Sequence, residues 1–384
     1  MRVAFDGRSL ASPALRGWDR YTVGLTRALT ARGVEATFLC RVGAPARAEH
    51  LAGIDCEVRE VPARYGVLWE QVAVPALLRR ERFDLHHAPN EHGVPIVAPC
   101  PQVLTHHSVT GPSYRALVRS GALPGPTERY VPVPGGRLKR GRDRAYLGAQ
   151  VRAAAHIFAP SEFARGELIG LLKVPARKVT VTPLAPDDLF RGPPTPAAER
   201  AAILDRLGVR PPFLLFVGGY EPHKNVPGLL RTFQHVRRTR PDLRLVLVGS
   251  QPAPAAVRES AAELGVADAA AFLHGLTREL PALYDAAELL VSLSWRETFC
   301  LPAAEAMCRG TPAVASAWGA TPEVIGAGGA TVDPRDEAGA AARICDLLAG
   351  DRAPLRRAAR ARAAELTWEA AADRTLQVYR RLVG

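Results

Sequence analysis

The sequence predicts an α/β protein made of two doubly wound domains with a cleft between them. Short apolar runs alternate with longer helical patterns over almost the whole chain, which is typical of βαβ units and parallel sheets. At 384 residues the chain is too long for one ordinary core. The alternation lapses in the proline-rich passage from Leu184 to Pro212, which holds one short helix. We therefore expect domains over residues 1–188 and 189–367.

The first domain is predicted from apolar, β-branched runs that are separated by amphipathic stretches. Strands are expected, in order, at RVAFD (2–6), EATFLC (35–40), DLHHAPN (84–90), QVLTHHS (102–108), AHIFAPS (155–161) and KVTVTP (178–183). Helices are expected at RYTVGLTRALTAR (20–32), which stops at Gly33, and in the amphipathic segment 65–83.

The second domain repeats this alternation. Strands are expected at FLLFVGG (213–219), LRLVLVGS (243–250), AAFLHG (270–275), ELLVSLS (288–294), PAVAS (312–316) and ATVDP (330–334). Helices are expected at 226–238, 255–265 and 280–287, in an alanine-rich stretch that ends at Gly310, and two or three times more before the end. Ligands of such sheets bind at the carboxyl ends of the strands, so the loops that follow the strands are where we expect the site.

Charge and composition narrow the class of protein. The net charge of +12 favours anionic partners such as nucleotides, phosphates, nucleic acid or acidic lipid, although a general preference for arginine explains the charge equally well. Aromatic residues make up 6% and do not alternate with basic ones, which argues against nucleic-acid binding. Neither half carries G-x-G-x-x-G after its first strand, which argues against a nicotinamide-dependent oxidoreductase.

Cysteine usage and hydropathy favour a cytoplasmic location. The six cysteines form no C-x-x-C pair, so we expect neither a zinc site nor a disulfide framework. The N-terminus reads as a strand rather than a signal peptide, and no apolar run reaches the length of a membrane span. The basic helix at Gly135–Ala155 leaves open peripheral contact with anionic lipid on the inner face of a membrane; a solvated basic helix is the equal alternative.

Two loops of the second domain carry glycines after a strand. In FVGGYEPHKNVPGLL the strand ends at Val217, Gly218 and Gly219 permit close backbone approach, and Lys224 and Asn225 stand before a helix. That combination suits a phosphate, and a plain turn with a solvated lysine is the alternative. In FLHGLTRELPALY the chain turns at Gly275 toward a helix that we expect to be capped near Thr277; by itself this loop reads as an ordinary connection.

The third loop, WRETFCLPAAEAMCRGTPAVAS, holds Glu297 and Glu305 among small and apolar residues. Pro302 fits the first turn of a helix, so the free amides of 298–301 crowd its positive end and suit an anion. A carboxylate accepts two hydrogen bonds from a vicinal diol, so the two glutamates suit sugar hydroxyls on either side of that anion. The loop thus predicts a nucleotide-diphospho-sugar, with helix capping by Glu305 as the alternative.

ETFCLPAAEAMCRGTPAVAS…PEVIG resembles the E-x7-E signature of the retaining glycosyltransferases of family 4. FVGGYEPHKN is similar to that family's phosphate loop in the mannosyltransferase-like form. ALRGWDRY is similar to its G-I-G-R-Y motif, and VLTHHSV to its V-x-T-I-H-D-L motif. FAPSEFARGEL and LTWEAAADRTLQVYRRL also match the family's pattern, so the resemblance covers essentially the whole chain. It implies the GT-B fold, two facing Rossmann-like domains, the first for the acceptor and the second for the nucleotide-sugar. It also implies that a helix over 368–384 packs back on the first domain.

The resemblance also implies residue roles. The catalytic group would be His107 beside the anomeric centre, Glu297 on hydroxyls of the transferred sugar, and Lys224 on the pyrophosphate. The remaining donor contacts would come from glycines, backbone amides and one diol-binding carboxylate, namely Gly17, Gly218, Gly219, Asn225, Gly275, Leu276, Thr298, Phe299, Cys300, Leu301 and Glu305. No metal and no cofactor is implied, because the sugar nucleotide is a co-substrate and the family is thought to use front-face attack with retention.

Several positions depart from the family pattern. Gly219 stands where an arginine is usual, and His223 occupies the arginine position of the mannosyltransferase-like subgroup. Asp19 replaces a small residue that normally faces the diphosphate, and Ser108 replaces the aspartate of the H-D pair. Thr298 and Cys300 replace two glycines.

The resemblance does not fix the substrates. A GDP-mannose-like donor is favoured, with UDP-sugars next, and the acceptor is a hydroxyl of a polysaccharide precursor, a lipid-linked sugar or a secondary metabolite. A non-catalytic nucleotide-binding protein of the same fold, a phosphorylase or a sugar-phosphate synthase stays open as an alternative, as does, with less support, a nucleic-acid-binding protein.

Overall fold

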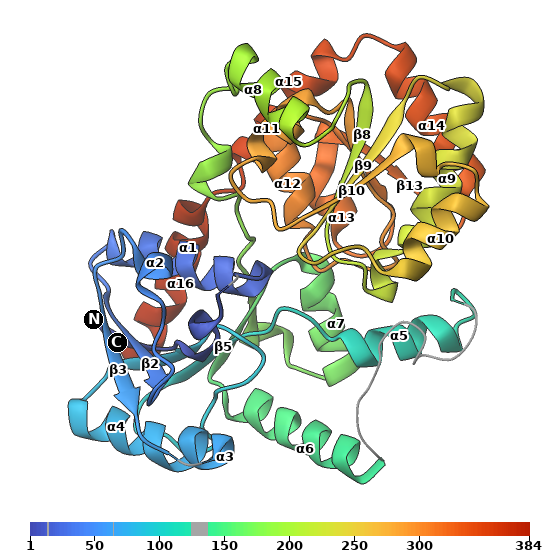
Figure 1. Ribbon diagram of the computed structural model, residues 1–384. Coiled ribbons are helices and arrows are strands. Elements are labelled where there is room, and N and C mark those ends of the chain that lie inside the picture. The colour runs from blue at the N-terminus through green and yellow to red at the C-terminus, as the bar shows by residue number, and fades with distance from the viewer. Residues whose placement is uncertain (14, 64, 124–136) are drawn as a thin grey trace. The chain divides into compact units, whose positions relative to one another are not determined.

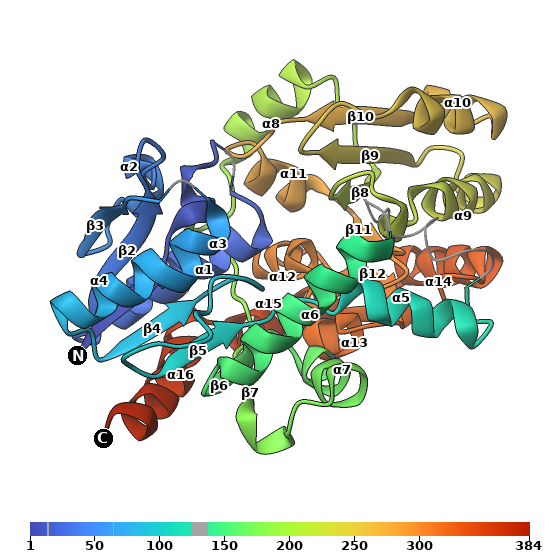
Figure 2. The ribbon, with the colours of Figure 1, turned by 90° about the horizontal axis from the view of Figure 1, so that it is seen from below.

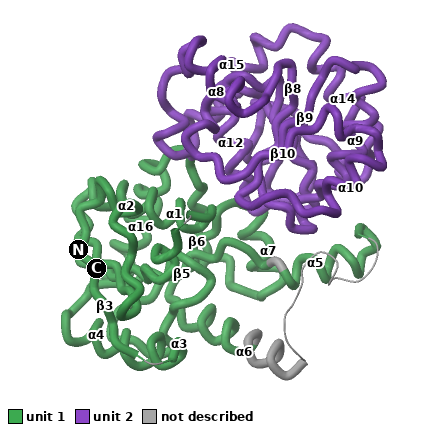
Figure 3. The backbone as a smooth tube through the Cα atoms, in the orientation of Figure 1, with its two compact units in different colours: residues 1–124, 132–185, 367–384 green, residues 125–131, 186–366 purple. Residues whose placement is uncertain are grey.

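Two parallel sheets organise the chain in this computed structural model, each in its own unit (Figure 3). The structure describes residues 1–13, 15–63, 65–123 and 137–384, apart from the side chains of Thr110 and of residues 137–144. Unit 1 takes the described residues from Met1 to Ala185 and from Thr367 to Gly384, and unit 2 takes Pro186 to Leu366. Among the described helices, none has both the length and the apolar character that a membrane crossing requires.

The sheet of unit 1 has the strand order β3-β2-β1-β4-β5-β6-β7, and neighbouring strands run parallel. Figure 1 shows β2 and β3 side by side at one edge of this sheet. Its strands are β1 (Arg2–Asp6), β2 (Glu35–Arg41), β3 (Cys56–Val61), β4 (Leu85–Ala88), β5 (Gln102–Thr105), β6 (His156–Ala159) and β7 (Val179–Val181). The central strands are buried on both faces, and polar residues within them pair with one another, as His87 of β4 does with the Thr105 hydroxyl of β5 at 2.7 Å.

Helices cover both faces of this sheet, and Figure 2 shows α4 and α16 on opposite sides of β4 and β5. The helical segments are η1 (Arg8–Ala11), α1 (Gly17–Thr30), α2 (Ala48–Leu51), α3 (Gly66–Leu68), the π-turn η2 (Trp69–Ala73), α4 (Val74–Glu81), α5 (Thr110–Arg119), α6 (Arg137–Ala153), α7 (Glu162–Leu172), η4 (Ala176–Lys178) and α16 (Trp368–Val383). On one face Ala4 and Leu39 pack against Trp69 and Leu78. On the other, the hydroxyl of Tyr379 from α16 hydrogen-bonds Nδ1 of His87 in β4 at 2.6 Å.

Unit 2 has the parallel strand order β10-β9-β8-β11-β12-β13. Its strands are β8 (Phe213–Val217), β9 (Arg244–Gly249), β10 (Ala270–His274), β11 (Leu289–Ser292), β12 (Ala313–Ser316) and β13 (Gly329–Val332). Its helical segments are η5 (Asp188–Phe190), α8 (Ala197–Arg206), η6 (Pro222–Lys224), α9 (Val226–Thr239), α10 (Ala255–Glu263), η7 (Ala267–Ala269), α11 (Leu280–Ala286), α12 (Leu301–Cys308), α13 (Thr321–Ile325), η8 (Gly326–Gly328), α14 (Glu337–Ala349) and α15 (Ala353–Ala364). The apolar residues of α9 pack on β8 and β9, with Phe233 and Leu245 fully buried.

Both sheets therefore begin with the doubly wound order 3-2-1-4-5-6. In such a sheet the winding reverses between the first and fourth strands, and the connections leave these two strands toward opposite faces. The crevice outside their carboxyl ends is where ligands bind. This rule directs attention to the loops after β1 and β4 in unit 1, and after β8 and β11 in unit 2.

Some local expectations were incomplete or wrong. The helix predicted from Arg20 begins at Gly17, and β3, α2, α5 and α7 were not predicted. The helix expected to be capped near Thr277 begins at Leu280, because the chain after β10 makes a turn first. The predicted basic helix at Gly135–Ala155 forms α6, but the side chains that carry most of its charge lie outside the described residues.

Candidate active site

A partly buried ion pair joins the loops that follow β8 and β11 in unit 2. Lys224 Nζ lies 2.8 Å from Glu297 Oε1, and the Ser294 hydroxyl donates to the same oxygen at 2.8 Å. The side chains of Lys224 and Glu297 are 20% and 13% exposed. The two residues are far apart in sequence and meet because their strands are neighbours in the sheet.

The electrostatics keep this pair ionised. Burial opposes the charge on Glu297, but the Lys224 ammonium outweighs it and lowers the pKa of the carboxyl. Burial also opposes the charge on Lys224, and the Glu297 carboxylate outweighs it and raises the pKa of the ammonium. Burial, followed by the nearby Lys224, lowers the pKa of His223. His223 is therefore neutral at pH 7 and does not replace the arginine of the subgroup as a cation.

Backbone hydrogen bonds hold the Lys224 loop against the chain that follows β11. The amide of Trp295 donates to the His223 carbonyl at 2.9 Å. Asn225, buried and left-handed at φ 52°, donates its side-chain amide to the Leu293 carbonyl at 2.9 Å. Asn225, predicted as a donor contact, thus joins the two loops and positions Lys224 in this structure.

The glycines Gly218 and Gly219 lie at the start of the same loop and are half-buried. A Cβ atom at Gly219 would lie 2.1 Å from Oε2 of Glu221. The Glu221 side chain therefore fills the space beside the position where the family carries an arginine.

The N-terminus of α12 presents unused backbone amides. Within the described residues, the amides of Thr298, Phe299, Cys300 and Leu301 donate no hydrogen bond. Cys300 is the N-cap at φ 79°, in the left-handed region that a family glycine adopts without strain, and Pro302 occupies the first turn. Burial raises the pKa of the Cys300 thiol to about 12, so this cysteine is not a nucleophile at neutral pH.

Glu305 lies apart from this pair, on α12 and only 2% exposed. Its Oε2 accepts a hydrogen bond from the Tyr284 hydroxyl at 2.9 Å. Gly275 and Leu276 follow β10; Gly275 is exposed at φ 68° and donates its amide to the Gly249 carbonyl. The structure brings Lys224 and Glu297 into contact at the start of α12, which also carries Glu305. The Gly275 turn follows the edge strand β10, which is separated from β11 by β9 and β8.

In unit 1, Asp19 has a local structural role. Its Oδ2 accepts a hydrogen bond from the Arg16 amide at 2.9 Å, which caps α1, and the side chain is 2% exposed. This cap explains why α1 starts at Gly17, earlier than predicted. Gly17 itself is exposed at the first position of the helix.

His107 is buried after β5 and donates from Nε2 to the Pro89 carbonyl at 2.9 Å. Burial lowers its pKa to about 4, so the ring is neutral at pH 7 with its lone pair on Nδ1. The ring meets Tyr21 edge-on at a centroid distance of 5.0 Å.

Sequence reasoning missed Glu91, which supplies a carboxylate beside His107. Its Oε1 accepts from the Ser108 amide at 2.8 Å and from the Ser108 hydroxyl at 2.9 Å. The family's aspartate is replaced by Ser108, and Glu91 from the loop after β4 brings a carboxylate back to this segment. β4 pairs with β5 so that His86 lies opposite Gln102, 16 residues further along the chain. Aligning the two predicted strands in this way would have indicated that the segments after them, which carry Glu91 and Ser108, lie close together.

Comparisons with known proteins agree with this geometry. Residues 205–365 match the family described as glycosyl transferases group 1, and residues 15–188 match glycosyltransferase family 4. An O-antigen chain mannosyltransferase B of Escherichia coli is 33% identical over 62% of this chain and 63% of its own length. A D-inositol 3-phosphate glycosyltransferase of Xylanimonas cellulosilytica is 33% identical over 73% of this chain and 66% of its own length. The chain thus spans just under two thirds of the length of these two relatives.

Among solved structures, Anabaena Alr3699/HepE in complex with UDP-glucose has a TM-score of 0.76 at 17% identity, with both chains covered in full. That likeness establishes the fold, and the two family matches cover nearly the whole chain. The chain belongs to the group 1 glycosyltransferases of family 4, and its two doubly wound units have the GT-B fold.

Proposed function

We propose that this chain is a retaining glycosyltransferase that moves a hexose from a nucleotide-diphospho-sugar to a hydroxyl acceptor. The observation that carries the proposal is the Lys224–Glu297 pair beside the free amides at the start of α12. It lies at the carboxyl ends of β8 and β11, where the winding of the sheet reverses. A cation, a helix N-terminus and a carboxylate are what a diphosphate joined to a sugar requires.

The division of labour follows from the chemistry of each group. When the bond between the sugar C1 and the diphosphate oxygen breaks, negative charge grows on the departing phosphate. Lys224 and the α12 amides stabilise that charge, and fixed donors in a water-poor site cost no reorganisation at that moment. Glu297 accepts hydrogen bonds from hydroxyls of the sugar and fixes its orientation. The acceptor oxygen then adds to C1 on the same face, and its hydroxyl proton passes to the departing phosphate oxygen.

The remaining assignments rest on the family resemblance. Glu305 takes the ribose diol, which requires the diol to exchange with the Tyr284 hydroxyl. Backbone near Gly275 and Leu276 meets the base, Gly17 meets the diphosphate and His107 lies beside the anomeric centre. Neutral His107 offers an acceptor at Nδ1, so its part is to receive a hydrogen bond from a sugar hydroxyl rather than to supply charge.

For the donor we favour a GDP-mannose-like sugar nucleotide, with UDP-sugars second. The E-P-H-K-N loop and the similarity to a mannosyltransferase support the first choice, and the likeness to a protein that binds UDP-glucose supports the second. The acceptor is a hydroxyl of a sugar, a lipid-linked sugar or a phosphorylated polyol, the last suggested by the inositol phosphate glycosyltransferases. Contact with an anionic membrane stays a hypothesis.

The test is a thermal-shift panel of GDP, UDP, ADP, dTDP and NAD with the wild type and the Lys224→Met variant. At about 100 times its dissociation constant a ligand adds roughly 2.7 kcal/mol of stability, which is readily visible. We expect one nucleoside diphosphate to stabilise the wild type and to lose most of that effect in the variant. No shift with any nucleoside diphosphate would contradict the proposed function.

A further inference from the structure

A row of buried hydrogen bonds crosses unit 1 from α16 to the segment after β7. The Tyr379 hydroxyl contacts His87 Nδ1 at 2.6 Å, and His87 Nε2 lies 2.7 Å from Thr105 Oγ1. Thr105 donates to the Tyr21 hydroxyl oxygen at 3.1 Å, and that oxygen lies 3.3 Å from Thr182 Oγ1. All five residues are fully buried. The row therefore joins α16, β4, β5, α1 and the end of the sheet without contact with solvent.

The protons of this row point in one direction. Thr105 has one hydroxyl proton and donates it to Tyr21, so His87 Nε2 must donate to Thr105. Burial lowers the pKa of His87 well below its usual value, so the ring is neutral and its Nδ1 accepts from the Tyr379 hydroxyl. Tyr21 then donates its own proton to Thr182. Hydrogen bonds aligned in one sense polarise and strengthen one another.

Tyr21 also touches the two segments that lead into and out of unit 2. The polypeptide enters unit 2 after Ala185 and returns to unit 1 at Thr367. The Tyr21 hydroxyl contacts Thr182, which comes just before the first of these connections. The Tyr21 ring meets the ring of Trp368, which comes just after the second, edge-on at a centroid distance of 6.0 Å. One buried side chain thus links both connecting segments within unit 1.

The same ring packs against His107. The two rings meet edge-on, with centroids 5.0 Å apart and an interplanar angle of 83°. Thr105, which donates to Tyr21, lies two residues before His107 in the chain. His107 is 8% exposed, whereas Tyr21 is fully buried. His107 is therefore the point at which this buried cluster comes nearest to a bound substrate.

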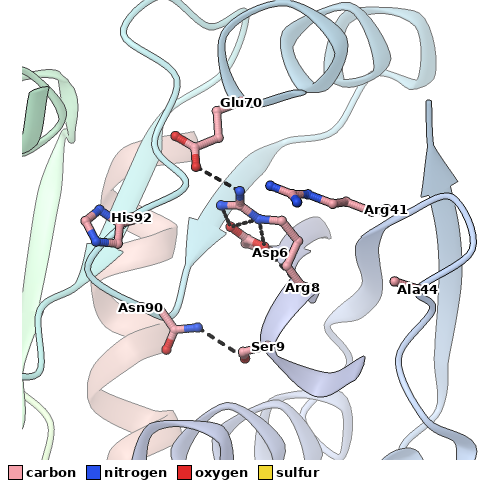
Figure 4. Close-up of a pocket in the computed structure, with 8 residues that line it drawn as sticks. All are labelled: Asp6, Arg8, Ser9, Arg41, Ala44, Glu70, Asn90 and His92. Atoms are coloured by element: carbon pink, nitrogen blue, oxygen red, sulfur yellow. Dashed lines mark hydrogen bonds and ion pairs between the residues drawn. The ribbon is translucent and has the colours of Figure 1, made fainter. Parts of the chain in front are cut away.

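A second element, the loop after β4, fixes the other side of the His107 ring. Its Pro89 carbonyl accepts from His107 Nε2 at 2.9 Å, and the next residue, Asn90, donates to the Ser9 hydroxyl at 3.2 Å (Figure 4). Asn90 and Ser9 belong to the unit 1 pocket, whose other lining residues are Asp6, Arg8, Arg41, Ala44, Glu70 and His92. A single hydrogen bond leaves a ring free to turn about it, and the contact with Tyr21 restricts that turn.

We infer that Tyr21 is a positioning residue for sugar transfer: it holds the His107 ring in place, and its hydroxyl makes that position depend on Thr182 beside the connection to unit 2. Tyr21 is fully buried and acts through His107 rather than on the substrate. A neutral imidazole accepts a hydrogen bond in a narrow range of directions, so a small turn of the ring weakens its contact with a sugar hydroxyl. This inference rests on the proposed function for the word transfer, but the link between Tyr21 and His107 does not.

The first test needs no substrate: the full chain is labelled with ¹⁵N in its histidine rings and its magnetic resonance spectra are recorded. The proteins are the wild type, Tyr21→Phe, and Tyr379→Phe as the matched control. Tyr379 is an equally buried tyrosine in the same row, and its hydroxyl contacts His87 rather than His107. His87→Gln and His107→Gln identify the signals of the two rings.

We expect both His87 and His107 to carry their proton on Nε2 in the wild type. Tyr21→Phe should move the His107 signals, and it should free the Thr105 hydroxyl to donate to His87 instead, which shifts the His87 proton to Nδ1. Tyr379→Phe should leave both rings as they are in the wild type. Unchanged His107 signals in Tyr21→Phe, the same displacement in both variants, or a wild-type His87 protonated on Nδ1 would overturn the inference.

The second test is turnover, measured as release of nucleoside diphosphate from GDP-mannose and from UDP-glucose. Tyr21→Phe and Thr182→Val should each lower kcat about 10-fold and leave the donor KM unchanged, because the displaced group is His107 and not a donor contact. Tyr379→Phe should lower the melting temperature as much as Tyr21→Phe does, yet keep a kcat close to that of the wild type. An equal loss of kcat in Tyr379→Phe would mean that Tyr21 only stabilises the fold.

The two tests separate this inference from the proposed function. If the wild type releases no nucleoside diphosphate from either donor, the proposed function is contradicted, while the histidine spectra still decide whether Tyr21 positions His107. If the wild type is active and Tyr21→Phe has the same kcat, the proposed function stands and this inference falls.

Discussion

Replacing Lys224 by Met removes the charge that balances Glu297, and two separate effects follow. At an effective dielectric constant of about 20, the attraction across the 2.8 Å contact is about 6 kcal/mol. Desolvation of two groups that are 20% and 13% exposed offsets at least half of this. We therefore expect the variant to lose about 2–3 kcal/mol of unfolding free energy, because Glu297 keeps its burial without its partner.

The catalytic effect has a different origin. Lys224 stabilises charge that appears only as the diphosphate leaves, so its loss should lower turnover about 100-fold or more, equivalent to roughly 2.7 kcal/mol. Glu297→Gln should lower turnover by a similar factor through weaker sugar binding. Turnover is measured as release of nucleoside diphosphate from the donor, and stability as urea denaturation of the full chain.

The double variant Lys224→Met/Glu297→Gln distinguishes the two effects. It has no unpaired charge, so it should recover most of the stability that Lys224→Met loses, and it should stay inactive. Arg231→Met is the control, since Arg231 forms an exposed pair with Glu337 at 2.7 Å and should cost less than 1 kcal/mol. Recovery of activity in the double variant, or full stability in Lys224→Met, would refute the reasoning.

Three further predictions concern stability. Burial lowers the pKa of His107 to about 4 from an unfolded value near 6.5, so the unfolded chain takes up the proton first as pH falls. This residue therefore removes about 2 kcal/mol of stability between pH 7 and pH 5. His107→Gln should reduce that pH dependence in urea titrations, and an unchanged slope would count against a buried neutral ring. Cys300→Gly should be more stable than Cys300→Ala by roughly 0.5–1 kcal/mol in thermal unfolding, because residue 300 has φ 79° and only glycine adopts this left-handed backbone without strain. If the alanine variant is the more stable of the two, this backbone is not strained. Arg309→Met should lower the free energy of unfolding by about 3–5 kcal/mol in the same assay. The Asp285 carboxylate is 3% exposed and lies 2.5 Å from the Arg309 guanidinium, so the variant leaves it buried without its cation. A loss below about 1 kcal/mol would show that Asp285 finds other donors.

Much of the fold could be predicted because both sheets are buried and parallel. Buried strands such as β8 and β9 read as continuous apolar runs, and helices such as α9 show a clear apolar face. The edge strand β3 was missed since half of its six residues are charged and it is only partly covered. The start of α1 was misplaced because its cap depends on a side chain that bends back to Arg16.

The candidate site was predicted less completely, because its contacts join distant segments. The sequence indicated that Lys224 and Glu297 belong to one site, through loops at strand ends, but not that they pair directly. It gave no sign that Asn225 links two loops or that the Glu91 carboxylate accepts hydrogen bonds from Ser108. The unit 1 pocket was not predicted at all, since its lining residues come from four segments and carry no local motif.

The position of α16 has a consequence for synthesis. This helix packs on α1 in unit 1, where Trp368 fills the space over Gly24, yet it follows the whole of unit 2 in the chain. At about 5–20 residues per second, the ribosome takes roughly 10–40 s to make unit 2. During that time the groove over Gly24 is uncovered, while the stretch 186–366 of unit 2 is completed without interruption. Unit 2 can therefore finish folding first, and a nascent chain stalled before Trp368 exposes an apolar surface that chaperones recognise.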